Sequence, residues 1–303
     1  TQVTLHLGNG MTHSCHHPSS HPIPLEEIAK SPNALHNTNF KKHQRKLMLN
    51  GKRPAECDYC WRIEDNKDGN FSDRVYKSFD AYSFKDHDDI SGLTGDENIF
   101  PRYVEVSFSN VCNFKCAYCG PNFSSIWAEE INKQGGYQLE DMFFNGGQDI
   151  QKQIANRQDN PYTDAFWEWF PEAIKHMHTF RITGGEPLLQ LNEELIDLLH
   201  EKKFKVAIET NGTILPPENI DWICVSPKKG ADFNLNYGNE IKLVYPQKGL
   251  DPKEFQDFDF DHFFIQPMDG KDLQKNILQS VSYCIENPLW RLSLQTHKIM
   301  GID

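Results

Sequence analysis

The chain has 303 residues, enough to bury one large hydrophobic core or two modest ones. Its 31 Lys and Arg stand against 43 Asp and Glu, and the formal charge of −12 disfavours binding to a nucleic-acid backbone. No apolar run approaches the ~18 residues of a membrane span, and the first residues do not resemble a secretory signal. We therefore expect a cytoplasmic protein, in which reducing conditions favour metal-binding or catalytic cysteines over disulfides.

Residues 1–100 are polar and rich in histidine, and they predict an irregular extension with one helix near residues 39–52. A cysteine pair with two intervening residues, Cys57 and Cys60, lies in this extension. Together with Cys15 and the nearby histidines at positions 13, 16 and 17, the pair predicts a zinc site or an auxiliary iron–sulfur cluster. Free thiols are the alternative interpretation.

Regular patterning begins at Tyr103, and it alternates strands with helices. Strands are predicted at 102–109, 180–183, 205–210, 221–227, 240–246, 261–267 and 291–295, and helices at 124–134, 164–179, 192–203 and 271–288. An irregular insert is expected at residues 133–165. This alternation indicates an α/β fold with a parallel sheet, open or closed into a barrel, whose chemistry sits at the carboxyl ends of the strands. We expect two domains, 1–100 and 101–303.

Three cysteines lie within eight residues, immediately after the first predicted strand of the second domain: Cys112, Cys116 and Cys119. Three thiolates at this spacing can hold three corners of a [4Fe-4S] cluster, since soft thiolates are the ligands that such clusters take. The fourth iron is then open to a small molecule. A zinc site is the alternative, and it would need a fourth Cys or His ligand. The other two cysteines, Cys224 and Cys284, are predicted to be core residues.

The cysteine spacing, with Tyr118 before the third cysteine, resembles the signature of radical S-adenosylmethionine (radical SAM) enzymes. The segment TGGEP follows the next strand and resembles that family's site for the aminocarboxylate end of SAM, formed here by Gly184, Gly185 and Glu186. The resemblance implies a partial (βα)6-type radical SAM barrel that binds a [4Fe-4S] cluster and SAM. Glu186 would accept from the SAM ammonium group.

Residues 181–302 resemble the 7-carboxy-7-deazaguanine synthase family through the blocks TGGEPLLQL, AIETNGT, VSPK, KLVYPQ, IQPMDG and SLQTHK. That resemblance implies a lyase that converts 6-carboxy-5,6,7,8-tetrahydropterin to 7-carboxy-7-deazaguanine through a 5′-deoxyadenosyl radical. It also implies a reductant such as flavodoxin or ferredoxin, and a homodimer. The implied SAM contacts are Thr210, Ser226, Lys228, Gln266 and Asp269, and His297 would face the pterin.

The first half departs from that synthase family. The family's glutamine–glycine–glutamate–glycine substrate segment is absent, and Gly120 and Pro121 stand where the family has the Asp-Thr that helps to hold Mg²⁺, so a Mg²⁺ site is in doubt. Residues 1–185 resemble instead phage and metagenomic twitch-domain radical SAM proteins. An alternative function is therefore a twitch-type enzyme that modifies a peptide or another substrate, and a second alternative is a non-enzymatic, metal-stabilised binding protein.

Overall fold

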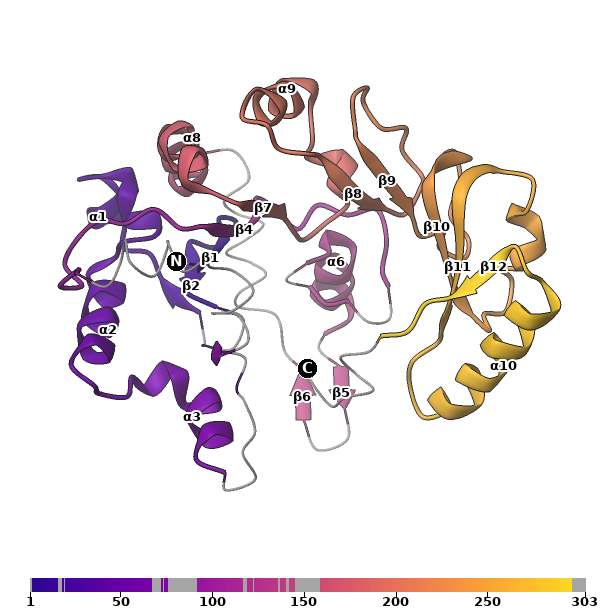
Figure 1. The fold of residues 1–303 in the computed structure, drawn as a ribbon, viewed down its shortest axis with the longest axis horizontal. Helices are drawn as coiled ribbons and strands as arrows, with labels where there is room; N and C mark the ends of the chain where they lie inside the picture. Colours follow the sequence, from indigo (N-terminus) through magenta and orange to yellow (C-terminus); the bar gives the residue numbers. More distant parts are fainter. Residues whose placement is uncertain are drawn as a thin grey trace. The chain divides into compact units, whose positions relative to one another are not determined.

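The structure is a computed structural model, and it describes residues 2–15, 18, 20–66, 72, 74–75, 92–116, 119–121, 123–135, 137–139, 142–144 and 159–295. By its internal contacts the chain forms two compact units, Thr1–Gly185 and Glu186–Asp303. Each unit is built around its own five-stranded sheet (Figure 1). The division therefore falls at the glycine turn and not near residue 100, where we expected it.

The sheet of the first unit has the strand order β3-β2-β1-β4-β7. Its parallel part joins β1 to β4 and β4 to β7, whereas β2 and β3 add antiparallel pairs at one edge. The strands are β1 (Gln2–His6), β2 (Met11–His13), β3 (His21–Pro22), β4 (Tyr103–Ser107) and β7 (Thr179–Ile182).

The expectation of an irregular amino-terminal extension is wrong at its first strand. Strand β1 is the middle strand of the sheet, and Val3, Leu5 and the adjoining Leu7 have no exposed surface. Apolar residues occupy every second position of this strand, which is the pattern of a strand that buries one face. The residues between them are polar, and they too are largely buried because β1 has a hydrogen-bonded neighbour on each side.

The helices of the first unit follow from local signals. Helix α2 begins after Thr38, whose hydroxyl accepts from the Lys41 N–H at 3.1 Å. Helix α8 begins with a proline after the capping residue Asn160. The helical elements are α1 (Leu25–Ile28), η1 (Pro32–Leu35), α2 (Asn39–Leu49), η2 (Ala55–Cys57), α3 (Asp58–Glu64), α6 (Ser125–Gln134), α8 (Pro161–Ala173) and η3 (Ile174–His176).

Aromatic side chains of α8 form much of the core of this unit. Phe166 and Phe170 are fully buried, and their rings lie 6.2 Å and 4.9 Å from the ring of Phe180 in β7. Part of the region expected to be irregular is ordered, since β5 (Tyr137–Leu139) and β6 (Met142–Phe144) pair as an antiparallel hairpin.

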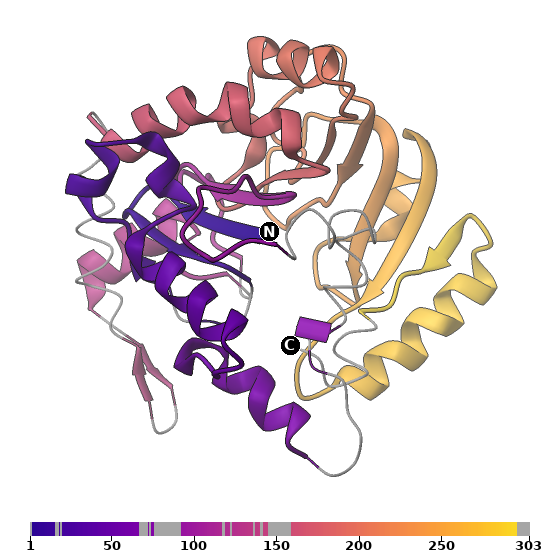
Figure 2. The ribbon, with the colours of Figure 1, turned by 60° about the vertical axis from the view of Figure 1, so that its left-hand side comes forward.

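The sheet of the second unit is entirely parallel, with the strand order β12-β11-β10-β9-β8. Figure 2 shows α10 beside β11 and β12. The elements are η4 (Pro187–Leu189), α9 (Glu193–Glu201), β8 (Ala207–Thr210), β9 (Trp222–Val225), β10 (Tyr237–Tyr245), η5 (Pro252–Phe255), β11 (Asp259–Pro267), α10 (Leu273–Glu286) and β12 (Trp290–Leu292).

One face of this second sheet carries the core of the unit. Ile223, Val225, Ile241, Leu243 and Ile265 are buried there, and apolar residues of the connecting loops pack against them. The predicted α/β class is therefore confirmed, while closure into a barrel stays a prediction. Among the helices that the structure describes, none is long and apolar enough to cross a membrane.

Candidate active site

A loop that carries Cys112, Cys116 and Cys119 follows β4 and is held against the start of α6. The Ser125 hydroxyl donates to the Cys112 carbonyl and accepts from the Cys112 N–H, both at 3.2 Å. The indole N–H of Trp127 donates to the Cys116 carbonyl at 2.9 Å. The first turn of α6 thus fixes the backbone on which the thiols sit, and it directs its partial positive charge at the loop.

The three thiols are half-buried and form no disulfide. Burial raises the pKa of Cys119; a hydrogen bond to the Gly120 backbone opposes this rise, and the neighbouring Cys116 and Cys112 add to it. The three sulfur atoms are therefore electrostatic neighbours. They do not converge on one point, since no group of three Cys, His, Asp or Glu in the described part of the chain lies close enough to share a metal ion.

Three thiolates are soft donors of the kind that a [4Fe-4S] cluster takes. A closed zinc site would need a fourth Cys or His ligand.

A glycine turn follows β7 and packs directly on the cysteine loop. Gly184 and Gly185 have φ angles of 78° and 69°, in the left-handed region that favours glycine. A Cβ atom on Gly184 would lie 2.6 Å from the Ser107 hydroxyl oxygen. The Gly185 N–H donates to the Phe123 carbonyl at 2.9 Å, four residues after the third cysteine. The structure therefore brings the two sequence motifs together within the first unit.

Glu186, the first residue of the second unit, is 3% exposed and has three hydrogen-bond donors. The Thr210 hydroxyl donates to its Oε1 at 2.5 Å, and the Asn211 N–H donates to its Oε2 at 3.1 Å. The Leu188 N–H donates at 3.4 Å. A carboxylate has about four acceptor positions, so Glu186 keeps capacity for a further donor.

The predicted contacts Thr210, Ser226 and Lys228 gather at the carboxyl ends of β8 and β9. The Ser226 N–H donates to the Thr210 carbonyl at 2.8 Å, and the Lys228 ammonium donates to the Ser226 hydroxyl at 2.9 Å. Lys228 is half-buried, which does not support a purely solvated surface lysine. An ammonium and two hydroxyls near a buried carboxylate make an edge suited to a zwitterionic ligand.

Gln266 and Asp269 lie at the end of β11. Gln266 pairs in register with Val244 of β10 and is half-buried. Asp269 is exposed, and its carboxylate accepts from the Gly270 N–H at 2.8 Å. Both residues are at the carboxyl edge of the sheet, as predicted, two strands away from β9.

The model of the radical SAM superfamily matches residues 106–287, well over half of the chain. The chain belongs to the radical SAM superfamily. The match begins in β4 and takes in the cysteine loop, the glycine turn and most of the second unit.

Individual radical SAM relatives match a shorter part of the chain. A 7-carboxy-7-deazaguanine synthase of Bradyrhizobium diazoefficiens is 51% identical over 121 residues, which are 40% of this chain and 58% of that protein. The Bordetella pertussis synthase is 56% identical over 120 residues, 40% of this chain and 57% of that protein. The Bacteroides thetaiotaomicron synthase is 43% identical over 124 residues, which are 41% of this chain and 65% of that protein. The chain thus spans less than two thirds of these relatives.

The predicted second metal site is only partly assembled. Burial, then the neighbouring Cys60, raises the pKa of Cys57, so these two cysteines are neighbours. Cys60 is buried on α3, and the carbonyl of Cys15 contacts the His13 ring. Within the described residues no third ligand joins the pair closely enough to hold an ion. The predicted cofactor contact Tyr118 and the predicted pterin contact His297 lie outside the described residues, as do His16 and His17.

Sequence reasoning missed the residues at the end of β1. His6 and Ser107 are register partners at the last position of the β1–β4 pair. Asn9 follows in the turn to β2, where its side chain accepts from the Met11 N–H at 3.2 Å. The alternation of apolar residues from Val3 to Leu7 was the signal that could have placed this strand beside the cysteine loop.

Proposed function

We propose that this radical SAM protein is a lyase of the 7-carboxy-7-deazaguanine synthase type, which converts 6-carboxy-5,6,7,8-tetrahydropterin to 7-carboxy-7-deazaguanine with loss of ammonia. The observation that carries the proposal is 51% to 56% identity to such synthases over about 120 residues. The matched part is less than two thirds of those proteins, so the substrate and activity are inferred from likeness.

In this proposal Cys112, Cys116 and Cys119 hold the [4Fe-4S] cluster. When bound and reduced, the cluster and SAM supply the radical that takes a hydrogen atom from the substrate. The chain itself supplies position, which in radical chemistry decides the C–H bond attacked. Flavodoxin or ferredoxin would supply the electron.

The second unit would hold the polar end of SAM. The remaining acceptor capacity of Glu186 suits the SAM ammonium, and Lys228 suits its carboxylate, since the charges are opposite in each pair. Gln266 and Asp269 would lie along the adenosine, and His297 would face the pterin. Mg²⁺ is not part of the proposal, because Pro121 has no oxygen in its side chain and its carbonyl already accepts from the Asn110 amide at 2.9 Å.

The test is a mass-spectrometric assay of anaerobically reconstituted, reduced protein with SAM and 6-carboxytetrahydropterin. We expect 7-carboxy-7-deazaguanine from the native chain and none from Cys116→Ala. Cys284→Ala, which removes a half-buried thiol on α10, is the matched control and should retain activity.

Two other outcomes separate the alternatives. Cleavage of SAM to 5′-deoxyadenosine without the deazaguanine product would leave a radical SAM enzyme with another substrate, such as the peptide substrate of a twitch-type enzyme. Absence of SAM cleavage in protein with full iron and sulfide content would contradict enzymatic function of this kind.

A further inference from the structure

An ion pair between the cysteine loop and α6 lies beside the proposed ligands of the cluster. Lys115 is the loop residue immediately before Cys116. Its ammonium forms an ion pair with the Glu130 carboxylate and lies 5.2 Å from the centre of the Trp127 ring. The side chains of Lys115 and Glu130 are 37% and 20% exposed, so both charges are partly buried. We call Lys115, Trp127 and Glu130 the lysine clamp.

The loop backbone is fixed on both sides of Lys115. On one side the Ser124 hydroxyl donates to the Phe114 carbonyl at 2.6 Å. On the other side the Trp127 indole N–H donates to the Cys116 carbonyl at 2.9 Å. Both donors belong to α6 or to its capping residue. The lysine ammonium is therefore held at a defined place relative to Cys116.

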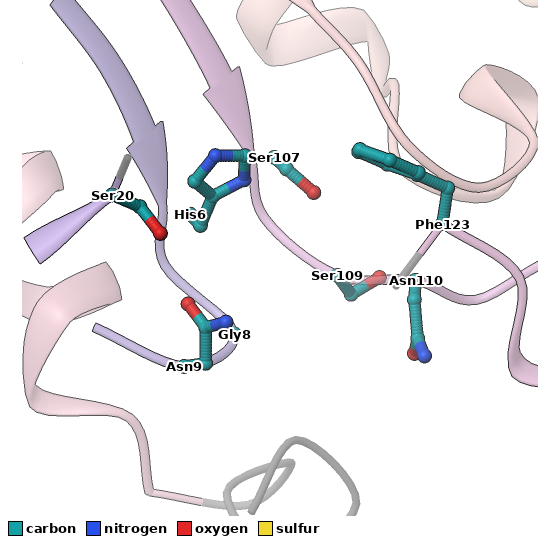
Figure 3. Close-up of a pocket in the computed structure, with 8 residues that line it drawn as sticks. All are labelled: His6, Gly8, Asn9, Ser20, Ser107, Ser109, Asn110 and Phe123. Atoms are coloured by element: carbon teal, nitrogen blue, oxygen red, sulfur yellow. The ribbon is translucent and has the colours of Figure 1, made fainter. Parts of the chain in front are cut away.

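The clamp does not line the polar cavity that adjoins the two ends of the cysteine loop. This cavity has a volume of about 180 Å³ and lies at the carboxyl ends of β1 and β4 (Figure 3). Its lining residues are His6, Gly8, Asn9, Ser20, Ser107, Ser109, Asn110 and Phe123. A change of charge in the clamp therefore leaves the walls of the cavity as they are.

The place of the clamp gives its charges an influence on the thiolates. Exposed ion pairs add little to stability, but a partly buried charge is screened less by water and salt than an exposed one. The reduction potential of an iron–sulfur cluster depends on the charges, hydrogen bonds and solvent exposure around it. A nearby positive charge raises the potential, because it stabilises the negative charge that reduction adds, and a negative charge lowers it.

We propose that the lysine clamp sets the reduction potential of the cluster, with Glu130 cancelling the charge of Lys115 and so keeping the potential low. Trp127 holds the ammonium through its ring face. The step concerned is the transfer of one electron from a low-potential reductant to the oxidised cluster, in which no bond forms or breaks. A lower potential makes the reduced cluster a stronger donor toward SAM. Glu130 and Trp127 are thus positioning residues, since they act through Lys115 and the loop backbone.

The proposal rests on the proposed function only in that the three cysteines must hold the cluster, and its test needs no substrate. Lys115→Gln and Glu130→Gln, alone and combined, are reconstituted with iron and sulfide. Each protein is titrated with reductant in the absence of SAM while electron paramagnetic resonance follows the reduced cluster. We expect Glu130→Gln to shift the equilibrium about 3- to 10-fold toward the reduced cluster, which is roughly 30–60 mV at 59 mV per tenfold.

The other variants separate charge from structure. Lys115→Gln should shift the potential about as far in the opposite direction, because it leaves the Glu130 charge uncancelled. The combined variant removes both charges and should return the potential to the native value, which a loss of structural contact would not do. Glu129→Gln is the matched control on α6, and it should leave the potential near the native value because water screens an exposed charge.

Cluster content is measured in the same samples, so failure of the clamp and failure of the proposed function are distinguishable. Equal potentials in all these proteins, or shifts of the same sign in both single variants, would overturn the clamp while the proposed function stands. Native protein that binds no iron and sulfide would contradict the cysteine assignment, and the clamp with it. The expected shifts in protein that does not turn over the pterin would uphold the clamp and overturn the proposed substrate.

Discussion

At the scale of single residues, the glycine turn is a position where the backbone conformation strongly restricts the type of residue. Gly184 combines a φ of 78° with a Ser107 hydroxyl oxygen only 2.6 Å from the position that a Cβ atom would occupy, so Ser107 would have to turn away. Gly51 has a nearly equal φ of 68°, but nothing lies within 4 Å of the point that its Cβ atom would occupy. The pair therefore separates the cost of a left-handed residue from the cost of steric overlap.

Gly184→Ala should lower the free energy of unfolding more than Gly51→Ala does. A left-handed alanine costs about 1–2 kcal/mol in either position, and moving the Ser107 hydroxyl at Gly184 adds about 0.5–1.5 kcal/mol. Urea denaturation of the two variants measures the difference. Equal losses in the two variants would show that the turn has room for a methyl group and would contradict the close packing.

A buried thiol gives a second prediction at this scale, and it depends on pH. Cys224 is 3% exposed, its Sγ donates to Glu240 Oε1 at 3.4 Å, and burial raises the pKa of the thiol to about 12. At pH 8 the thiolate is then about one part in 10⁴, against roughly a quarter for an ordinary thiol with a pKa of ~8.5. Alkylation needs the thiolate, so its rate should rise about tenfold per pH unit below the pKa.

Peptide mass spectrometry after brief iodoacetamide treatment tests this prediction. Cys224 should stay unmodified at pH 8 in native protein and react readily once urea has unfolded the chain. Modification of native protein at the unfolded rate would place the thiol in solvent and refute the burial argument.

At the scale of elements, strand β1 organises the first sheet. Leu5 has no exposed surface and lies on the strand between β2 and β4. Leu5→Ala should therefore cost about 2–5 kcal/mol of unfolding free energy through lost burial and a residual cavity. Leu25→Ala, at a leucine that is 51% exposed, should cost less than about 0.5 kcal/mol.

Thermal and urea denaturation measure both leucine variants, and iron content after reconstitution gives a second readout. We expect less iron bound in Leu5→Ala, since β4 leads directly into the cysteine loop. If Leu5→Ala were no less stable than Leu25→Ala, the central place of β1 would be wrong.

Strands β4 and β7 to β12 could be predicted from the sequence, while β1 to β3, β5 and β6 could not. Segments such as 261–267 combine apolar runs with flanking turns, so local pattern alone identified β11. Strand β1 offers only two apolar side chains, Val3 and Leu5, among glutamine, threonine and histidine. Its stability comes from β4, a partner far along the chain, and local pattern does not report such a partner.

At the scale of the whole molecule, the contacts divide the chain between Gly185 and Glu186. The likeness of residues 1–185 to twitch-domain proteins stays a prediction. The expected boundary near residue 100 ignored the parallel pairing of β1 with β4.

The candidate site, too, could be predicted only in part from the sequence. The three cysteines and the glycine turn follow from local spacing and could be predicted. The cavity at His6 and Ser107 depends on the register of two strands, and the bond between Glu186 and Thr210 joins two separate elements. Contacts of this kind become known only when the chain is folded.

The register of β1 against β4 also bears on how the protein is made. It joins Gln2 to Tyr103, roughly 100 residues apart, and pairings over such a span form slowly because loop closure costs entropy before any contact is gained. We therefore expect the pairing of β1 with β4 to slow the folding of the first unit. A newly synthesised copy would acquire iron and sulfide efficiently only after this slow step, so cofactor loading would distinguish finished molecules from unfinished ones.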